Sequence, residues 1–166
     1  MANWYILCTL LRHEKKVAEK LTDLGFEVFL PSRKVRKKWS DRMKIVEELV
    51  MTRVVFVHCE ESERKQTFVD SGSFYMMDRA NNKVAIVPDK QIEDFRAIIS
   101  QSAFSFEFIE RQLKPGLKVT INNTVFNNVE AEVVSIEGKE RVFVRVNMLG
   151  CAVIDVQKAD LSAANS

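Results

Sequence analysis

The stretch NWYILCTL, residues 3–10, decides the fold of the first part of the chain. Its aromatic, aliphatic and β-branched residues are typical of a buried strand. The residues that follow, 12–24, repeat apolar side chains with the spacing of an amphipathic helix. The repeating side chains are Val17, Leu21 and Leu24. Gly25 can then adopt the left-handed conformation that commonly ends a helix. The sequence therefore predicts a buried strand followed directly by a helix.

Strands and helices continue to alternate after this first pair. Further strands are predicted at residues 26–32, 52–59, 72–78 and 84–87. A short helix is predicted to begin at Ser62, and a longer one begins at Asp89. The longer helix places Ile92, Phe95 and Ile99 on one face. Helices mixed with an antiparallel sheet indicate an α+β domain.

The composition changes after this α+β region. The phenylalanines of AFSFEF, residues 103–108, alternate in a way that fits an edge strand or a linker. Helix signals then vanish, and short β-rich runs separated by turns follow. These runs cover residues 117–121, 129–137, 141–149 and 151–156. The sequence thus predicts three parts: a first domain over 1–102, a linker over 103–112, and a small all-β barrel over 113–166.

The totals are those of an ordinary soluble globular protein. The chain has 166 residues, of which 46% are hydrophobic and 29% are charged. No apolar run approaches the roughly 20 residues that a membrane-spanning helix needs. Near the N-terminus the basic residues follow the apolar stretch, which is the reverse of the order in a signal peptide. We therefore expect a cytoplasmic protein without a membrane partner.

The residue types that support catalysis or metal binding are sparse. Cys8, Cys59 and Cys151 are far apart, each lies in an apolar run, and no C-x-x-C spacing occurs. His13 and His58 lie near no cluster of potential ligands. The chain also lacks the glycine-rich phosphate motifs, the G-x-S-x-G nucleophile turn and the H-E-x-x-H zinc motif. The sequence therefore predicts buried reduced cysteines, no metal, no cofactor and no enzymatic activity.

The stretch RKVRKKWSDRMK, residues 33–44, concentrates positive charge. It holds seven basic residues, one acid and a tryptophan, although the whole chain has a formal charge of only +2. With Ser40 and Asp41 as the turn, it is predicted to be a polar hairpin or a flexible loop. Lys34, Arg36 and Lys37 are candidate phosphate contacts, and a tryptophan can stack on an exposed base. Lysine-rich hairpins are also common simply because charge keeps strand edges soluble.

Several stretches, in this order, resemble the NusG family of transcription elongation factors. They are Trp4–Tyr5, the charged hairpin after LPS, LVMTRVVFV at 49–57, AIVPDKQI at 85–92, and KPG at 114–116. The resemblance covers nearly the whole chain. It is strongest to specialised, operon-targeted members such as RfaH and the UpxY-type capsule-locus antiterminators. Their C-terminal domains end in a pattern similar to NMLGCAVIDVQKADL, residues 147–161.

The resemblance implies a fold and a mechanism. The fold would be a ferredoxin-like, NGN-type domain followed by an SH3-like, KOW-type barrel. The first domain would bind the clamp helices of RNA polymerase, hold the clamp closed and suppress pausing or termination, without covalent chemistry. The implied partner of the barrel is a ribosomal protein or a termination factor.

The resemblance also suggests site residues. The implied polymerase-binding residues are Val54 and Phe56, with Cys8, Ile92 and Phe95 near the same surface. A contact with the opposite lobe of the polymerase would lie near Arg64 and Lys65. The residues implied to touch the displaced non-template DNA strand are Arg12, Lys16 and Lys20.

Two other functions fit parts of the sequence. A ribosome- or RNA-binding KOW protein would need a basic C-terminal domain, but residues 114–166 hold six basic and six acidic side chains. A small enzyme on a ferredoxin-like fold would need a pocket of perturbed titratable groups, and the motif search above gives it no support.

Overall fold

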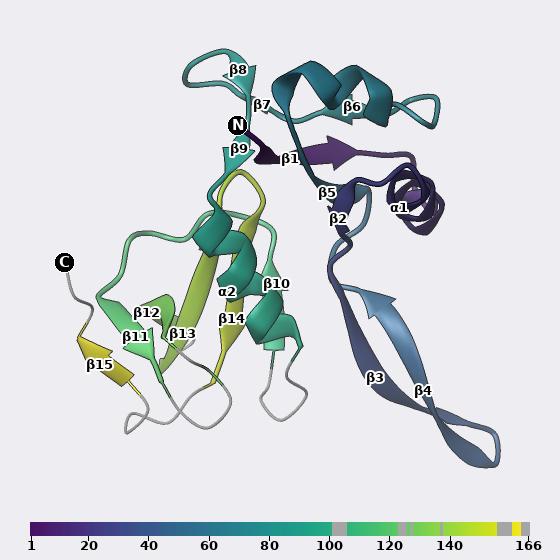
Figure 1. Ribbon diagram of the computed structural model, residues 1–166. Helices are drawn as coiled ribbons and strands as arrows, with labels where there is room; N and C mark the ends of the chain where they lie inside the picture. Colours follow the sequence, from purple (N-terminus) through teal and green to yellow (C-terminus); the bar gives the residue numbers. More distant parts are fainter. Residues whose placement is uncertain (101–105, 123–125, 127, 137, 156–160, 164–166) are drawn as a thin grey trace. The chain divides into compact units, whose positions relative to one another are not determined.

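The computed structural model divides the chain into two compact units, residues 1–89 and 90–166 (Figure 1). The structure describes residues 1–100, 106–122, 126, 128–136, 138–155 and 161–163. The boundary between the units, after Asp89, falls inside the first domain predicted from the sequence, because the helix that begins there groups with the second unit. Each unit is described below by itself.

An antiparallel sheet forms the framework of the first unit. Its strands are β1 (Asn3–Cys8), β2 (Glu27–Phe29), β5 (Val54–Cys59), β6 (Phe74–Tyr75) and β9 (Ile86–Val87). The spatial order is β2-β5-β1-β6, and β9 pairs with β1 beside β6. The strand β1 is central because it pairs with β5 along its whole length, from Asn3↔Cys59 to Cys8↔Val54. The sheet predicted from the apolar runs is confirmed.

Helix α1 (Glu14–Asp23) covers one face of this sheet. Val17 and Leu21 are fully buried there, in a cluster of side chains from β1 and β5. Gly25 has the predicted positive φ of 91°, and the N–H of Phe26 donates to the carbonyl of Leu21. The prediction that Leu24 belongs to the buried face of this helix is wrong, because its side chain is 59% exposed beyond the last helical turn.

Two short elements differ in detail from the predictions. The helix expected at Ser62 is a 3-10 helix, η1 (Glu61–Thr67), and Glu60 rather than Ser62 caps it. The Glu60 and Glu63 side chains form a capping box that satisfies backbone N–H groups at its start. The strand predicted over residues 72–78 is split into β6 and β7 (Met77–Asp78), and β7 pairs with β8 (Lys83–Val84).

The charged stretch forms a long hairpin of β3 (Ser32–Trp39) and β4 (Arg42–Leu49). Ser40 and Asp41 lie at the turn, as predicted, and the register runs from Ser32↔Leu49 to Trp39↔Arg42. Within the described part of the chain, β3 and β4 pair only with each other. Figure 1 shows the hairpin extending away from the sheet of its own unit.

The second unit contains α2 (Asp89–Ile99) and a six-stranded antiparallel sheet. The strands in spatial order are β10 (Phe106–Ile109), β14 (Gly150–Ile154), β13 (Lys139–Val146), β12 (Val129–Ile136), β11 (Lys118–Ile121) and β15 (Leu161–Ala163). The described residues of this segment are rich in strands, as predicted, and β10 is an edge strand within the predicted linker. Closure into a barrel is not confirmed, because β10 and β15 end the path of described pairs.

Polar contacts join α2 to this sheet. The Asp94 carboxylate accepts from Lys90 Nζ at 2.8 Å and from the Glu130 N–H at 3.3 Å. Gln91 and Asn147 exchange two hydrogen bonds, and the Phe95 and Phe108 rings lie 5.8 Å apart. Burial raises the pKa of Asp94, although Lys90 opposes the shift.

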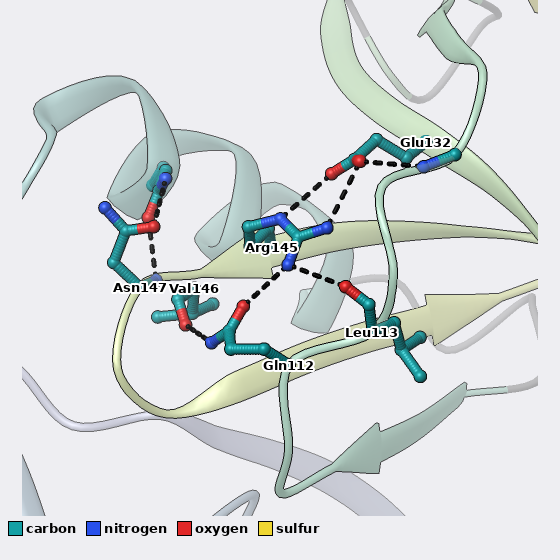
Figure 2. A network of polar contacts seen from close by, with 8 residues as sticks. Gln112, Leu113, Glu132, Arg145, Val146 and Asn147 are labelled. Carbon is teal, nitrogen blue, oxygen red and sulfur yellow. Dashed lines mark hydrogen bonds and ion pairs between the residues drawn. The ribbon is translucent and has the colours of Figure 1, made fainter.

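A second polar network fixes the segment between β10 and β11 (Figure 2). The Arg145 guanidinium donates to both carboxylate oxygens of Glu132 and to the Leu113 carbonyl. It also donates to Gln112 Oε1 at 2.8 Å, and Gln112 in turn donates to the carbonyl of Val146. One arginine thus connects three segments that are distant in the sequence.

Candidate functional site

One face of the first sheet brings together three of the five predicted polymerase-binding residues. Directly paired residues on neighbouring strands point to the same side, and Cys8 pairs with Val54. Side chains alternate along a strand, so Phe56 shares this face with Val54. The opposite face carries Val55 and Val57, which pack in the core with α1. The alternation therefore separates a candidate partner face from the helix-covered face.

All five predicted polymerase-binding residues are buried. Cys8 and Val54 are 8% and 6% exposed, and Phe56 is fully buried. Ile92 and Phe95, which lie on α2, are 2% and 0% exposed. The apolar surface expected from the sequence is therefore not open in this structure, and the assignment of these residues stays a prediction.

Two further residues lie on the same face and were missed in the sequence. Ile6 pairs with Phe56, and Phe29 of β2 also pairs with Phe56, with the two aromatic rings stacked at 5.6 Å. The strand alternation of β1, counted from Cys8 back to Ile6, could have found the first. Cys8 is buried, as the sequence predicts, and this burial raises the pKa of its thiol.

The candidate DNA contacts at α1 are all exposed. Lys16 and Lys20 are one helical turn apart, so they share a face, and Arg12 lies just before the helix. Lys16 Nζ lies 3.4 Å from the Asp70 carboxylate, which also contacts His13 Nδ1 at 2.7 Å. The hydrogen bond from His13 lowers the pKa of Asp70, with Lys16 contributing. The structure thus leaves all three cations exposed, and one of them, Lys16, shares the Asp70 carboxylate with His13.

Glu14 explains why the helix begins later than predicted. Its carboxylate is 2% exposed and accepts the backbone N–H groups of Arg53 at 2.8 Å and Arg12 at 3.3 Å. Both arginines have positive φ angles, 64° and 70°, so neither continues a helix or a strand. Burial alone would raise the pKa of Glu14, but the hydrogen bonds outweigh it and lower the pKa.

The residues suggested for the opposite lobe of the polymerase have different surroundings. Lys65 is exposed on η1. Arg64 is 22% exposed, and its guanidinium lies over the rings of Tyr5 and Tyr75 at 5.2 and 5.8 Å. Arg64 also pairs with Glu61 at 3.2 Å. Arg64 therefore packs within its own unit, and Lys65 is the accessible member of the pair.

The hairpin divides the three predicted phosphate contacts between two faces. Strand alternation and the observed register place Lys34 and Arg36 on one face, with Met43 and Ile45 of β4. Lys37 lies on the other face, with Trp39, Arg42 and Lys44. All of these side chains are exposed. The sequence identified the charged stretch correctly but did not show which cations act together.

The described residues offer no sign of a metal centre or a membrane span. No three histidine, cysteine, aspartate or glutamate side chains among them lie close enough to hold a metal ion. Likewise, none of the helices described is long and apolar enough to cross a membrane.

Comparison with known proteins identifies the family to which this chain belongs. The family model described as transcription termination factor nusG matches residues 2–96, which is more than half of the chain. The chain belongs to the NusG family. NusG-family proteins are transcription factors that interact with RNA polymerase, and this agrees with the expectation of a non-enzymatic elongation or antitermination role.

One solved structure similar to this NusG-family chain is described as "Domain interaction in Thermotoga maritima NusG". Its TM-score is 0.46 and its sequence identity is 17%, over 99% of this chain and 98% of that chain. No curated protein matches the chain.

Proposed function

We propose that this NusG-family protein is a specialised elongation and antitermination factor that acts in the cytoplasm on a polysaccharide biosynthesis operon. The observation that carries the proposal is the family match over residues 2–96, together with the tail resemblance to operon-specific members. The protein binds the clamp helices of RNA polymerase and suppresses pausing or termination. It performs no covalent step and requires no cofactor.

The proposed polymerase contact in the first unit is the sheet face that carries Cys8, Val54 and Phe56. Ile92 and Phe95 of α2 are proposed as separate contacts in the second unit. An apolar face of this kind suits a helix laid into a groove. Because all five side chains are buried here, the binding-competent state must expose them. The gain on burying them again against a helix is about 25 cal/mol for each Å² of apolar surface.

The proposed nucleic-acid contacts are exposed already. Arg12, Lys16 and Lys20 would meet the displaced non-template DNA strand, and Lys34, Arg36 and Lys37 of the hairpin would meet nearby phosphates. In this function the first domain is of the ferredoxin-like, NGN type. The C-terminal sheet is of the SH3-like, KOW type, and it recruits a ribosomal protein or a termination factor.

The rival function, RNA or ribosome binding through the C-terminal domain, finds less support. Two basic residues of that domain are engaged with its own acids: Arg141 pairs with Glu107 and Asp155, and Arg145 pairs with Glu132. These pairs leave less positive charge for a phosphate backbone.

The test is a pull-down of the RNA polymerase of the source organism with the full-length protein. Phe56→Ala should abolish capture, whereas Val55→Ala, which truncates a buried side chain on the opposite face of the same strand, should retain it. Circular dichroism confirms that each variant is folded. Phe56→Leu, which keeps most of the core volume, should reduce capture if the alanine variant unfolds. Equal capture by the Phe56 and Val55 variants, or none by the wild type, contradicts the proposed contact.

Operon specificity needs a separate readout. Transcription through a terminator should increase with the leader of a polysaccharide locus upstream, and should not increase with an unrelated leader. Equal read-through on both templates contradicts the operon-specific part of the proposal and leaves a general elongation factor.

A further inference from the structure

We propose that the outer half of one hairpin face binds single-stranded nucleic acid by stacking an unpaired base on Trp39. This tryptophan face consists of Lys37, Trp39, Arg42 and Lys44, which the register of β3 and β4 places on the same side. The inference deepens the hairpin contact of the proposed function, because it names the ligand class and the residues that select it.

The exposure of Trp39 is the first observation. The chain has two tryptophans, and Trp4 is 5% exposed whereas Trp39 is 53% exposed at the end of β3. Lysines at a strand edge keep it soluble without any aromatic neighbour, so solubility does not explain Trp39. An aromatic ring presents a flat surface on which any base can stack.

The arrangement of cations around the ring is the second observation. Lys44 Nζ lies 5.0 Å from the centroid of the Trp39 ring, and Arg42 is directly opposite Trp39. Lys37 is directly opposite Lys44, and like charges in that position repel each other. Lys37 also forms an ion pair with Glu48, which lies on the side of Lys37 farther from Trp39 and from the hairpin turn. An anion beside the ring would relieve the remaining repulsion.

The reverse face provides the contrast within the same hairpin. It carries three cations, Lys34, Arg36 and Lys38, and their partners on β4 are Glu47, Ile45 and Met43, without an aromatic ring. Met43 and Ile45 are 59% and 63% exposed there. Both faces are therefore basic, and charge alone does not distinguish them. Only the tryptophan face combines a flat ring with cations, which favours single strands because bases in a duplex are already stacked.

Binding is tested with the full-length protein and no polymerase. Fluorescence anisotropy compares a labelled oligothymidylate, an oligouridylate and a duplex of equal length. Trp39→Ala should weaken single-strand binding about 5- to 150-fold, the range for loss of one base–aromatic stack. Ile45→Ala, which removes an exposed apolar side chain from the reverse face, should leave it unchanged. Trp39→Phe should keep most of the affinity and abolish the quenching of tryptophan emission by the oligonucleotide.

The cations are tested by matched triple variants. Alanine at Lys37, Arg42 and Lys44 should reduce the slope of log affinity against log salt by about 2, as expected when three phosphate contacts on a single strand are lost. Alanine at Lys34, Arg36 and Lys38 removes the same charge from the reverse face and should change the slope less. Emission from the buried Trp4 and circular dichroism show that each variant is folded.

Three results overturn the inference: unchanged binding by Trp39→Ala, equal effects of the two triple variants, or a preference for the duplex. A preference for thymidylate identifies a DNA strand as the ligand, and a preference for uridylate identifies a transcript. If polymerase capture fails while Trp39-dependent binding persists, the proposed function falls and the single-strand site stands.

Discussion

The network around Arg145 gives the sharpest prediction about stability. Arg145 is 23% exposed and its partner Glu132 is 14% exposed, so the ion pair is largely removed from water. Arg145→Ala leaves Glu132 without its bidentate partner and removes the donor to the Leu113 carbonyl. Breaking a fully buried pair costs about 3–5 kcal/mol, and the residual exposure reduces the expected cost to about 2–3 kcal/mol.

The matched control is Arg141→Ala. Arg141, whose own side chain is 14% exposed, makes two ion pairs, and its partners Glu107 and Asp155 are both 58% exposed. Solvent-exposed pairs contribute at most about 1 kcal/mol, so this variant should cost less than that. The two arginines lie on the same strand, so their comparison tests the combined effect of a buried carboxylate partner and of the hydrogen bonds that Arg145 donates to Gln112 and Leu113.

The assay must report on the second unit alone. Both tryptophans and both tyrosines lie in the first unit, so intrinsic fluorescence does not follow β12 and β13. Native-state hydrogen exchange of peptides from these strands does. For Arg145→Ala, amides that exchange through opening of this unit should exchange about 30- to 150-fold faster, since about 1.4 kcal/mol corresponds to tenfold.

A double-mutant cycle with Glu132→Ala should give a coupling energy of about 1–2 kcal/mol. The reasoning is refuted if Arg145→Ala and Arg141→Ala accelerate exchange equally, or if Arg145 and Glu132 do not couple.

Three further predictions concern single residues. Burial raises the pKa of Tyr75 to about 12, so an absorbance titration should show a phenolate step near pH 12 that Tyr75→Phe lacks. Because the pKa is higher in the folded state, the contribution of Tyr75 to stability should decline between about pH 10 and 12. The pKa of Glu14 is lowered, so Glu14→Gln should reduce the free energy of unfolding by about 1 kcal/mol near pH 7. In urea melts this loss should shrink as the pH falls and the native carboxylate is protonated. A loss that does not change with pH contradicts the role of the charge. A Cβ on Gly116 would lie 1.9 Å from the Val133 carbonyl oxygen, so Gly116→Ala should reduce the stability of the second unit by about 1–3 kcal/mol. Hydrogen exchange of β12 measures this loss, and Lys114→Ala is the control that should leave it unchanged.

Apolar runs, helical spacing and turn residues were enough to predict most of the strands and helices. The runs at residues 3–10 and 52–59 became β1 and β5, and Ser40 and Asp41 became the hairpin turn. These predictions rest on period and turn chemistry, which are local properties of the sequence.

The errors arise where distant residues decide the local structure. The start of α1 depends on Glu14 binding the backbone of Arg53, which lies far along the chain. Closure of the C-terminal barrel depends on edge pairing that no local pattern encodes.

The candidate site was predictable only in part, for the same reason. The concentration of charge in residues 33–44 is visible in the sequence, but its division into two faces requires the register of β3 with β4. Cys8 and Val54 could be paired only once β1 and β5 were aligned. The family resemblance implied a polymerase contact near Arg64, yet its guanidinium lies over Tyr5 and Tyr75.

The isolation of the hairpin from the main sheet makes it a separable module. Its strands pair only with each other among the described residues, and the N–H of Val50 donates to the Pro31 carbonyl at its base. Insertions or deletions of two residues per strand would lengthen or shorten it while keeping every side chain on its own side. A single added residue in β3 would move Trp39 to the opposite side. Length changes in steps of two therefore offer a way to re-aim the hairpin without rebuilding the domain that carries it.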